Sequence, residues 1–284
     1  MNEMWSNPVS VEAMYGDWGL GADEGEAGVD GDFEAATEIL ARSLDPRPSK
    51  SIFDTIGALG IGAGDTVLDI GGRDGLHALA MAGRFGCRVV AVDPVEANVT
   101  RGLELIAHHE HGHLVEIRIG TIEQIPAEDG VYDAALSRDM LGHIADPAPA
   151  FAECLRVLRP GGAMVVHEVF ATALLEPEEE RRLCADIATY PERLSVAGFE
   201  SDVQSAGFSI ESLDLIGSEW SEASQESGAA PNYLLQVSRL RRARERLLEE
   251  LGEVPYRVMY GNALWSIYQL IGKLESRVYV LRKP

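Results

Sequence analysis

The chain has 284 residues, of which 46% are hydrophobic and 25% charged, and its formal net charge is −22 at pH 7. This charge repels a phosphate backbone, so the composition argues against a nucleic-acid partner; it slightly favours cationic ligands, although it can also serve solubility alone. No apolar run reaches about 18 residues, the start lacks the features of a signal peptide, and the three cysteines are scattered, so we expect a cytoplasmic protein without a membrane anchor.

The first 60 residues are predicted to form an N-terminal helical cap. A stretch rich in glycine and acidic residues over 16–32 is typical of a loop. Apolar residues then recur at helical spacing over 33–44 and over 51–59, and prolines separate these two predicted helices.

From Thr66 onward, short β-branched runs alternate with amphipathic segments. This alternation predicts an α/β fold of the Rossmann-like, doubly wound type, with a mostly parallel sheet covered by helices on both faces. Ligands of such sheets bind at the carboxyl ends of the strands. The predicted strands are 66–70, 88–93, 115–119, 132–137 and 163–169, and the predicted helices are 75–85, 95–109 and 147–157.

The pattern loosens after Phe170. Two helices (178–187 and 195–206) and a strand (208–216) are followed by a long charged helix within 219–251, an apolar helix over 255–271 and a last strand at 277–281. We therefore expect a nucleotide-binding core at 61–216, a helical insertion at 217–272 and a final core strand within 273–284.

The segment Val67–Gly75 has the order strand, glycine turn, helix, which directs backbone N–H groups at a ligand. The dinucleotide fingerprint fails here, because Arg73 and Leu76 stand where its second and third glycines belong; this argues against a nicotinamide oxidoreductase, which stays a rival hypothesis. Instead, Asp69, Gly71, Gly72 and Gly75 resemble the acidic-x-Gly-x-Gly-x-Gly loop of the class I S-adenosylmethionine-dependent methyltransferases, with Arg73 in place of its central glycine.

Three later segments resemble the same family. Asp93 and Pro94 end a second strand, Gly120–Pro126 is similar to the family segment that flanks adenine, and Leu155–Gly162 is similar to its Arg-Val-Leu-Lys-Pro-Gly-Gly turn. The resemblance runs from about residue 64 to 170 and is closest to ubiquinone/menaquinone-biosynthesis and natural-product enzymes. It implies a seven-stranded sheet with an antiparallel C-terminal strand, and a lid made of the N-terminal helices and the insertion.

The resemblance also implies the cofactor, S-adenosyl-L-methionine, and its site. Asp69 and the backbone of Gly71–Gly75 hold the methionine end, and Asp93 accepts hydrogen bonds from the ribose. The remaining predicted cofactor contacts are Pro94, Thr121, Ile122, Glu123, Ser137 and Tyr15. Thr121 stands where an aspartate is usual in the family, so a contact to the adenine amine is expected to be weaker.

Methyl transfer needs the nucleophile, methyl carbon and sulfur in line, and a base if the nucleophile is a hydroxyl or a protonated amine. His143 is the first candidate for that base because histidine titrates near neutrality; alternatively, it only packs in its loop. Glu168 either accepts a proton or orients His143. Asp139, on the same rim, faces substrate or cofactor.

Arg73 admits two interpretations. Its guanidinium reaches the cofactor carboxylate or pairs with Asp74, or else Gly72 supplies the backbone freedom of the turn while Arg73 points outward. We expect the second.

Four other features have a structural and a functional interpretation. Tyr15 and Trp18 either cover the cofactor or pack a terminal helix. The histidines of 108–113 resemble a metal cluster, but no functional metal is predicted because they lie on a loop away from the strand ends. The aromatic stripe at 256–268 belongs to the core or lines a substrate pocket, and the arginines of 239–246 read as a solvated face.

The sequence thus predicts a methyltransferase acting on a small molecule, with an oxygen acceptor first, nitrogen second and carbon third. The alternative within the fold is a cofactor-binding protein with altered chemistry, for instance a cyclase. A homo-oligomer is possible, and the acceptor is not encoded in a recognisable way.

Overall fold

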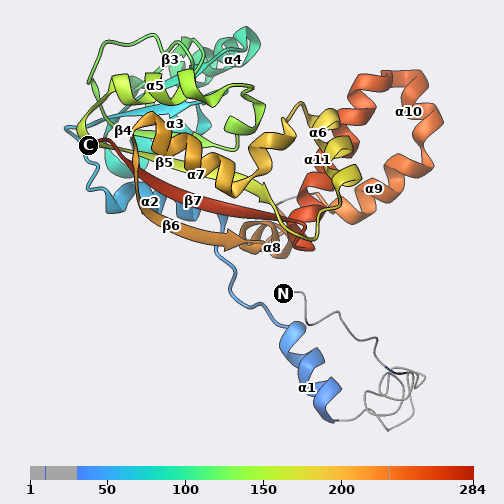
Figure 1. Cartoon of the computed structure of the whole chain (residues 1–284). Coiled ribbons are helices and arrows are strands. Elements are labelled where there is room, and N and C mark those ends of the chain that lie inside the picture. Colours follow the sequence, from blue (N-terminus) through green and yellow to red (C-terminus); the bar gives the residue numbers. More distant parts are fainter. Residues whose placement is uncertain (1–9, 11–30, 230) are drawn as a thin grey trace. The chain divides into compact units, whose positions relative to one another are not determined.

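The computed structural model describes residue 10 and residues 31–229 and 231–284 (Figure 1). The chain divides into two compact units, Met1–Pro46 and Arg47–Pro284. Among the described residues, the first unit contributes helix α1 (Gly31–Leu40), and all other elements belong to the second. No helix in the described ranges combines the length and apolar character needed to cross a bilayer.

The second unit is built on a seven-stranded sheet in the order β3-β2-β1-β4-β5-β7-β6. β7 runs antiparallel to both of its neighbours, β5 and β6, while the other paired strands are parallel. The predicted seven-stranded, mostly parallel sheet with an antiparallel C-terminal strand is confirmed. The strands are β1 (Thr66–Ile70), β2 (Arg88–Asp93), β3 (Val115–Ile119), β4 (Tyr132–Arg138), β5 (Leu158–Ala171), β6 (Ser209–Gly217) and β7 (Leu274–Arg282).

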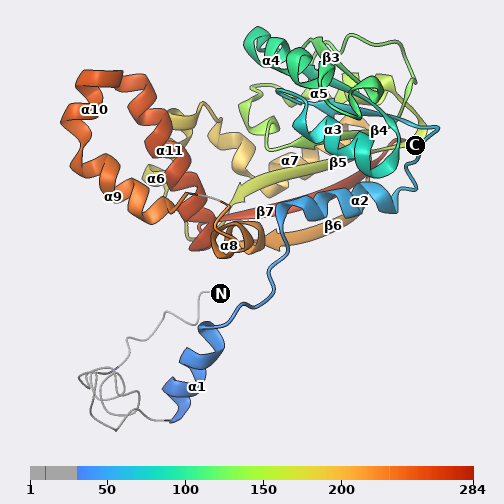
Figure 2. The ribbon, with the colours of Figure 1, turned by 180° about the vertical axis from the view of Figure 1, so that it is seen from behind.

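Helices cover both faces because successive strand residues point to opposite sides. In β1, Val67 belongs to a core cluster with α2 (Ile52–Ala58) and α3 (Leu76–Phe85), whereas Leu68 belongs to one with α5 (Pro147–Val157). α4 (Glu96–Ala107) joins the first face and α7 (Val196–Ala206) the second. Figure 2 shows α2 and α3 on the face opposite α5 and α7.

A group of helices lies beyond the end of the sheet where β5 finishes and β7 begins (Figure 1). Four of them connect β6 to β7, and α11 packs against a fifth, α6, which follows β5. They are α6 (Pro177–Ile187), α8 (Glu219–Glu226), α9 (Tyr233–Arg242), α10 (Arg244–Leu251) and α11 (Glu253–Leu270).

The single long helix predicted within 219–251 is wrong, because three helices occupy this range. α8 ends before Gly228, whose φ of 65° lies in the left-handed region. Asn232 then starts α9 with a new cap, its side chain accepting from the backbone N–H of Leu235. The second break comes at Ala243, where the backbone leaves helical values between α9 and α10.

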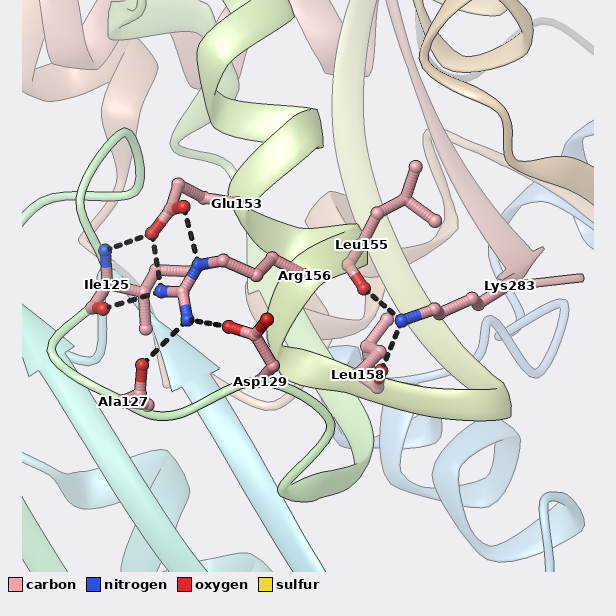
Figure 3. A network of polar contacts seen from close by, with 8 residues as sticks. All are labelled: Ile125, Ala127, Asp129, Glu153, Leu155, Arg156, Leu158 and Lys283. Atoms are coloured by element: carbon pink, nitrogen blue, oxygen red, sulfur yellow. Dashed lines mark hydrogen bonds and ion pairs between the residues drawn. The ribbon is translucent and has the colours of Figure 1, made fainter.

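Two cations hold neighbouring segments against the C-terminal end of α5 (Figure 3). Arg156 donates to the carbonyl oxygens of Ala127 (2.8 Å) and Ile125 (3.0 Å) and pairs with two carboxylates, those of Asp129 and Glu153. Lys283 Nζ donates to two carbonyl oxygens at the end of α5. Arg156 therefore holds residues 125–129, which follow the predicted adenine contacts, against α5.

Helix α4 reaches the glycine loop through Gly102. A Cβ at Gly102 would lie 2.4 Å from Ile117 Cδ1 and 3.0 Å from the carbonyl oxygen of Asp74. The backbone oxygen cannot move without distorting the loop, so the close approach requires glycine here.

We expect Gly102→Ala to lower the free energy of unfolding by about 1–3 kcal/mol, because overpacking outweighs the better helix propensity of alanine. Denaturant titration at 25 °C measures this. Gly62→Ala is the matched control, since a Cβ at Gly62 meets nothing within 4 Å. Equal stability of the two variants would contradict the tight contact.

Candidate cofactor and active site

The glycine loop closes onto the end of β2 through three consecutive backbone N–H groups. Those of Gly71 and Gly72 donate to the carbonyl oxygen of Val92 (2.9 and 3.2 Å), and that of Arg73 donates to Asp93 Oδ2 (3.0 Å). Gly75 then starts α3 without a side-chain cap, so the first N–H groups of the helix have no capping partner.

Arg73 itself takes a left-handed backbone conformation (φ 50°), whereas Gly72 does not. The prediction that Gly72 supplies the conformational freedom of the turn is therefore wrong. Gly72 is needed for space instead: a Cβ there would lie 2.8 Å from Ala91 Cβ and 3.0 Å from Asp69 Oδ2. The Arg73 side chain is exposed, and the ion pair with Asp74 considered from the sequence is not formed among the described residues.

Asp93 is 4% exposed and organises the loop from the end of β2. Its Oδ1 accepts from Val95 N–H (2.9 Å) and from Asn98 Nδ2 (3.0 Å), while Oδ2 takes the Arg73 N–H. Because each carboxylate oxygen has two lone pairs, Oδ2 keeps acceptor capacity for a ligand hydroxyl. Pro94, the next residue, is exposed.

The segment predicted to flank adenine presents backbone and exposed side chains. Ile122 is 2% exposed and packs into the core, whereas Thr121 and Glu123 are exposed. The N–H of Gln124 donates to the carbonyl oxygen of Thr121 (3.2 Å), which makes a tight turn. Of Ile122 itself, only the backbone is thus left for a ligand.

A cleft of about 390 Å³ opens beside the glycine loop, at the carboxyl ends of β1 and β4. Asp69 is 2% exposed in its wall, and its Oδ2 has no hydrogen-bond partner. Burial raises the pKa of this carboxyl to about 7, and Asp93 adds to the rise while Arg138 opposes it. The lining residues are Asp69, Ile70, Gly71, Gly72, Arg73, Asp74, Leu76, His77, Arg138 and Asp139.

Arg138 and His77 are among the cleft residues that were not predicted from the sequence. Arg138 ends β4, and its Nη1 donates to His77 Nε2 at 2.7 Å. Burial and the nearby arginine lower the pKa of His77 to about 4, so the imidazole is neutral. Burial also lowers the pKa of Arg138, although Asp139 and Asp69 oppose this. The only sequence signal was a cation directly before Asp139 at a strand end.

The three candidate catalytic residues lie on neighbouring segments. His143 is exposed, and its Nδ1 lies 2.9 Å from the carbonyl oxygen of Ala188. Since a carbonyl only accepts, Nδ1 carries the proton and the neutral ring keeps its lone pair on Nε2. Asp139 lies in the cleft wall with a left-handed backbone (φ 51°). The surrounding protein raises the pKa of its carboxyl, and His143 opposes that rise.

Glu168 is 5% exposed and is not among the residues lining the cleft. Its Oε1 accepts from the N–H groups of Met140 (3.1 Å) and Leu141 (2.8 Å). Burial and the neighbouring Asp139 raise the pKa of this carboxyl to about 8. The side chain holds the loop that carries His143.

Of the remaining predicted residues that the structure describes, Ser137 does not line the cleft. Ser137 is fully buried with an unpartnered Oγ, and Tyr15 lies outside the described residues, as does Trp18. Within the described ranges, no three histidine, cysteine or acidic side chains are grouped so as to hold a metal ion. In the 108–113 loop, His108 and His113 instead place Nδ1 near backbone carbonyl oxygens.

Comparison with known proteins agrees with this geometry. Residues 68–166 match the family model described as a methyltransferase domain. A ubiquinone biosynthesis O-methyltransferase of Xanthomonas axonopodis pv. citri (strain 306) is 30% identical over 184 residues, covering 61% of this chain and 75% of the relative. A sarcosine/dimethylglycine N-methyltransferase of Halorhodospira halochloris is 32% identical over 105 residues, covering 37% of this chain and 38% of the relative.

The fold is shared with a solved geranyl diphosphate methyltransferase in complex with S-adenosylmethionine, with a TM-score of 0.62, 19% identity, and coverage of 92% of this chain and 93% of that one. The chain spans only 38% of the length of the Halorhodospira enzyme, and 33% and 40% of the length of two further curated relatives. The matched residues 68–166 include the glycine loop and Asp93, and the solved structure shares the fold. The chain belongs to the class I S-adenosylmethionine-dependent methyltransferases.

Proposed function

We propose that this chain transfers a methyl group from S-adenosylmethionine to an oxygen or nitrogen of a small molecule in the cytoplasm. The observation that carries the proposal is the cleft beside the glycine loop, where Asp69 keeps a buried carboxylate oxygen without a partner. An unpaired buried carboxylate is costly, so a cationic ligand is expected to stabilise it.

The described residues fit this cofactor. Asp69 would hold the ammonium of its amino-acid end, and Asp93 Oδ2, which retains acceptor capacity, would accept a hydrogen bond from a ribose hydroxyl. Pro94, Thr121 and Glu123 lie on the exposed rim that continues from Asp93, with the Ile122 backbone beside them. When bound, the sulfonium supplies a methyl carbon already activated for displacement.

His143 is proposed as the general base. The hydrogen bond from Nδ1–H to Ala188 leaves Nε2 free to accept a proton from the acceptor hydroxyl or ammonium. Glu168 positions this residue indirectly, by binding the N–H groups of Met140 and Leu141 three and two residues before it. Asp139 shares the rim and is proposed to face the acceptor.

The helices between β6 and β7, together with α6, are proposed to form the acceptor side of the site and to exclude water. α11 buries Leu264, Ile267 and Tyr268 against α6, so the aromatic stripe is partly core. An oxygen acceptor is placed first and a nitrogen acceptor second, in line with the O- and N-methyltransferases among the relatives. A hydroxyl and a protonated amine both need a base that accepts their proton at a pH near neutrality.

Calorimetry with S-adenosylhomocysteine and with NAD tests the cofactor assignment. Binding of NAD alone would overturn the methyltransferase proposal in favour of an oxidoreductase. Incubation with S-adenosylmethionine and a panel of hydroxylated and amine metabolites, read by mass spectrometry for a gain of one methyl group, tests the reaction. Binding of S-adenosylhomocysteine without any methylated product would support altered chemistry on the same fold.

Binding of S-adenosylhomocysteine is predicted to weaken at low pH. Because the pKa of Asp69 is raised to about 7 in the free protein, the carboxylate must lose a proton before it holds the ammonium, and affinity falls about tenfold per pH unit below 7. Calorimetry between pH 5.5 and 7.5 measures the slope. Asp69→Asn weakens binding about tenfold to a hundredfold at pH 7.5 and removes the slope.

Asp54→Asn is the control, because Asp54 lies on the surface of α2 and outside the cleft; it keeps the slope. The stability of the free protein has the opposite pH dependence. Burial favours the protonated carboxyl and raises its pKa from 3.8 to about 7, so the melting temperature declines as pH rises between these two values, and Asp69→Asn flattens part of this decline. Binding independent of pH in the unmodified protein would contradict the assigned role.

Replacing the proposed base is predicted to slow methylation without loosening the cofactor. His143→Ala lowers kcat by about two to four orders of magnitude with a hydroxyl acceptor, because Nε2 no longer accepts its proton. Affinity for S-adenosylhomocysteine stays unchanged in calorimetry. His113→Ala, which removes an exposed histidine bonded to the Glu110 carbonyl, keeps full activity. A kcat equal to that of this control would exclude His143 as the base.

A further inference from the structure

Arg138 is a partly buried cation without a carboxylate partner. Its side chain forms no ion pair with any described acidic residue, and its one described hydrogen bond goes to His77 Nε2. The remaining N–H groups of the guanidinium have no described protein acceptor. Since desolvating a cation is costly unless it is paired, the arrangement indicates a missing anion.

The guanidinium is held in place by neighbours that cannot neutralise it. Its central carbon lies 5.5 Å from the ring centroid of Trp220, at the start of α8, within the range of a cation–π contact. The Trp220 ring is itself stacked on His167 at 4.5 Å, and its Nε1 donates to Ser51 Oγ at 3.0 Å. The plane of Arg138 is thus fixed before any ligand binds, which lowers the entropy cost of binding one.

Two further donors lie beside the guanidinium. The neutral His77 ring accepts from Arg138 at Nε2, so its Nδ1 carries the proton and is a donor. The ring belongs to the first turn of α3, whose N–H groups have no side-chain cap. A helix start of this kind favours negative charge.

The opposite charge is provided in the same cleft. Asp69 Oδ2 is buried, unpartnered and part of the cleft lining, as are Arg138 and His77. A volume of about 390 Å³ with one unpaired carboxylate and one unpaired guanidinium matches a ligand end that carries both an ammonium and a carboxylate.

We propose that Arg138 and His77 bind the carboxylate at the amino-acid end of the cofactor, opposite Asp69, which holds the ammonium. The proposal rests on the cofactor assignment made above. Arg138 donates two parallel N–H groups to the carboxylate, and Trp220 keeps the guanidinium in the plane that this requires. Because Trp220 lies at the start of the helical insertion, the position of α8 and the strength of the contact between Arg138 and the carboxylate are coupled.

The test compares two ligands that differ only in the carboxylate: S-adenosylhomocysteine and its decarboxylated analogue, S-adenosyl-3-thiopropylamine. By calorimetry, the unmodified protein binds the first about tenfold to a hundredfold more tightly than the second. Arg138→Met lowers affinity for S-adenosylhomocysteine by that factor and leaves affinity for the analogue unchanged. A merely structural role would weaken both ligands together, so the ratio of the two affinities identifies the contact.

Two further variants keep the result interpretable. Arg138→Lys retains the charge but not the planar fork of N–H groups, so it loses part of the ratio between the two ligand affinities. It replaces Arg138→Met in the test if the melting temperature shows that Arg138→Met does not fold. Arg84→Met is the matched control: this arginine of α3 pairs with Asp54, outside the cleft, and its loss leaves both affinities unchanged.

An unchanged ratio in Arg138→Met would overturn the proposal. A rise in KM for the acceptor alone would overturn it as well, and would assign Arg138 to an anionic acceptor. Failure of the unmodified protein to bind either ligand would instead reject the cofactor assignment itself, so the two failures are distinguishable.

Discussion

The carboxyl end of the sheet depends on how closely the backbone of residues 71–75 approaches its neighbours. The loop donates hydrogen bonds to Val92 and Asp93 on one side and meets Gly102 of α4 on the other. Close packing leaves no room for a Cβ at Gly72, where Ala91 and Asp69 are adjacent. This approach brings the first turn of α3 beside Asp69 and Arg138 and so forms the cleft.

The close approach requires a strained backbone at Arg73. A left-handed backbone is readily adopted by glycine and is strained for arginine, yet here the strain is accepted between two glycines that are also left-handed, Gly71 and Gly75. The N–H that this conformation directs at Asp93 offsets part of the strain. The departure from the family's glycine pattern therefore preserves the shape of the loop.

Most of the sheet could be predicted from the sequence, because each strand of an α/β fold is a short buried run and its neighbours are amphipathic helices. The breaks within 219–251 were missed because the arginine, leucine and glutamate residues of 239–251 have good helix propensity, and this composition outweighed the local break signals of Gly228 and Asn232. The glycine loop and Asp93 could be predicted because the residues that mark each of them are neighbours in the chain.

The remaining polar contacts of the site are made between distant segments. Arg138 and His77 are 61 residues apart, and Trp220 joins them only through the fold. Glu168 binds the backbone of the loop that carries His143. Whether a buried carboxylate faces a cleft or a backbone loop depends on side-chain direction, which periodicity does not give.

The connection from β6 to β7 has an evolutionary consequence. These strands are antiparallel neighbours in the sheet, so the ends of residues 218–273 are held close together whatever the helices between them do. Loop-closure entropy changes little with added length when the ends are already fixed by a sheet. Helices α9 and α10 can therefore be lengthened, shortened or exchanged between paralogues at small thermodynamic cost, while Trp220 keeps the root of the segment anchored in the core. The proposed acceptor side can thus diversify while the rest of the sheet and the cleft stay unchanged.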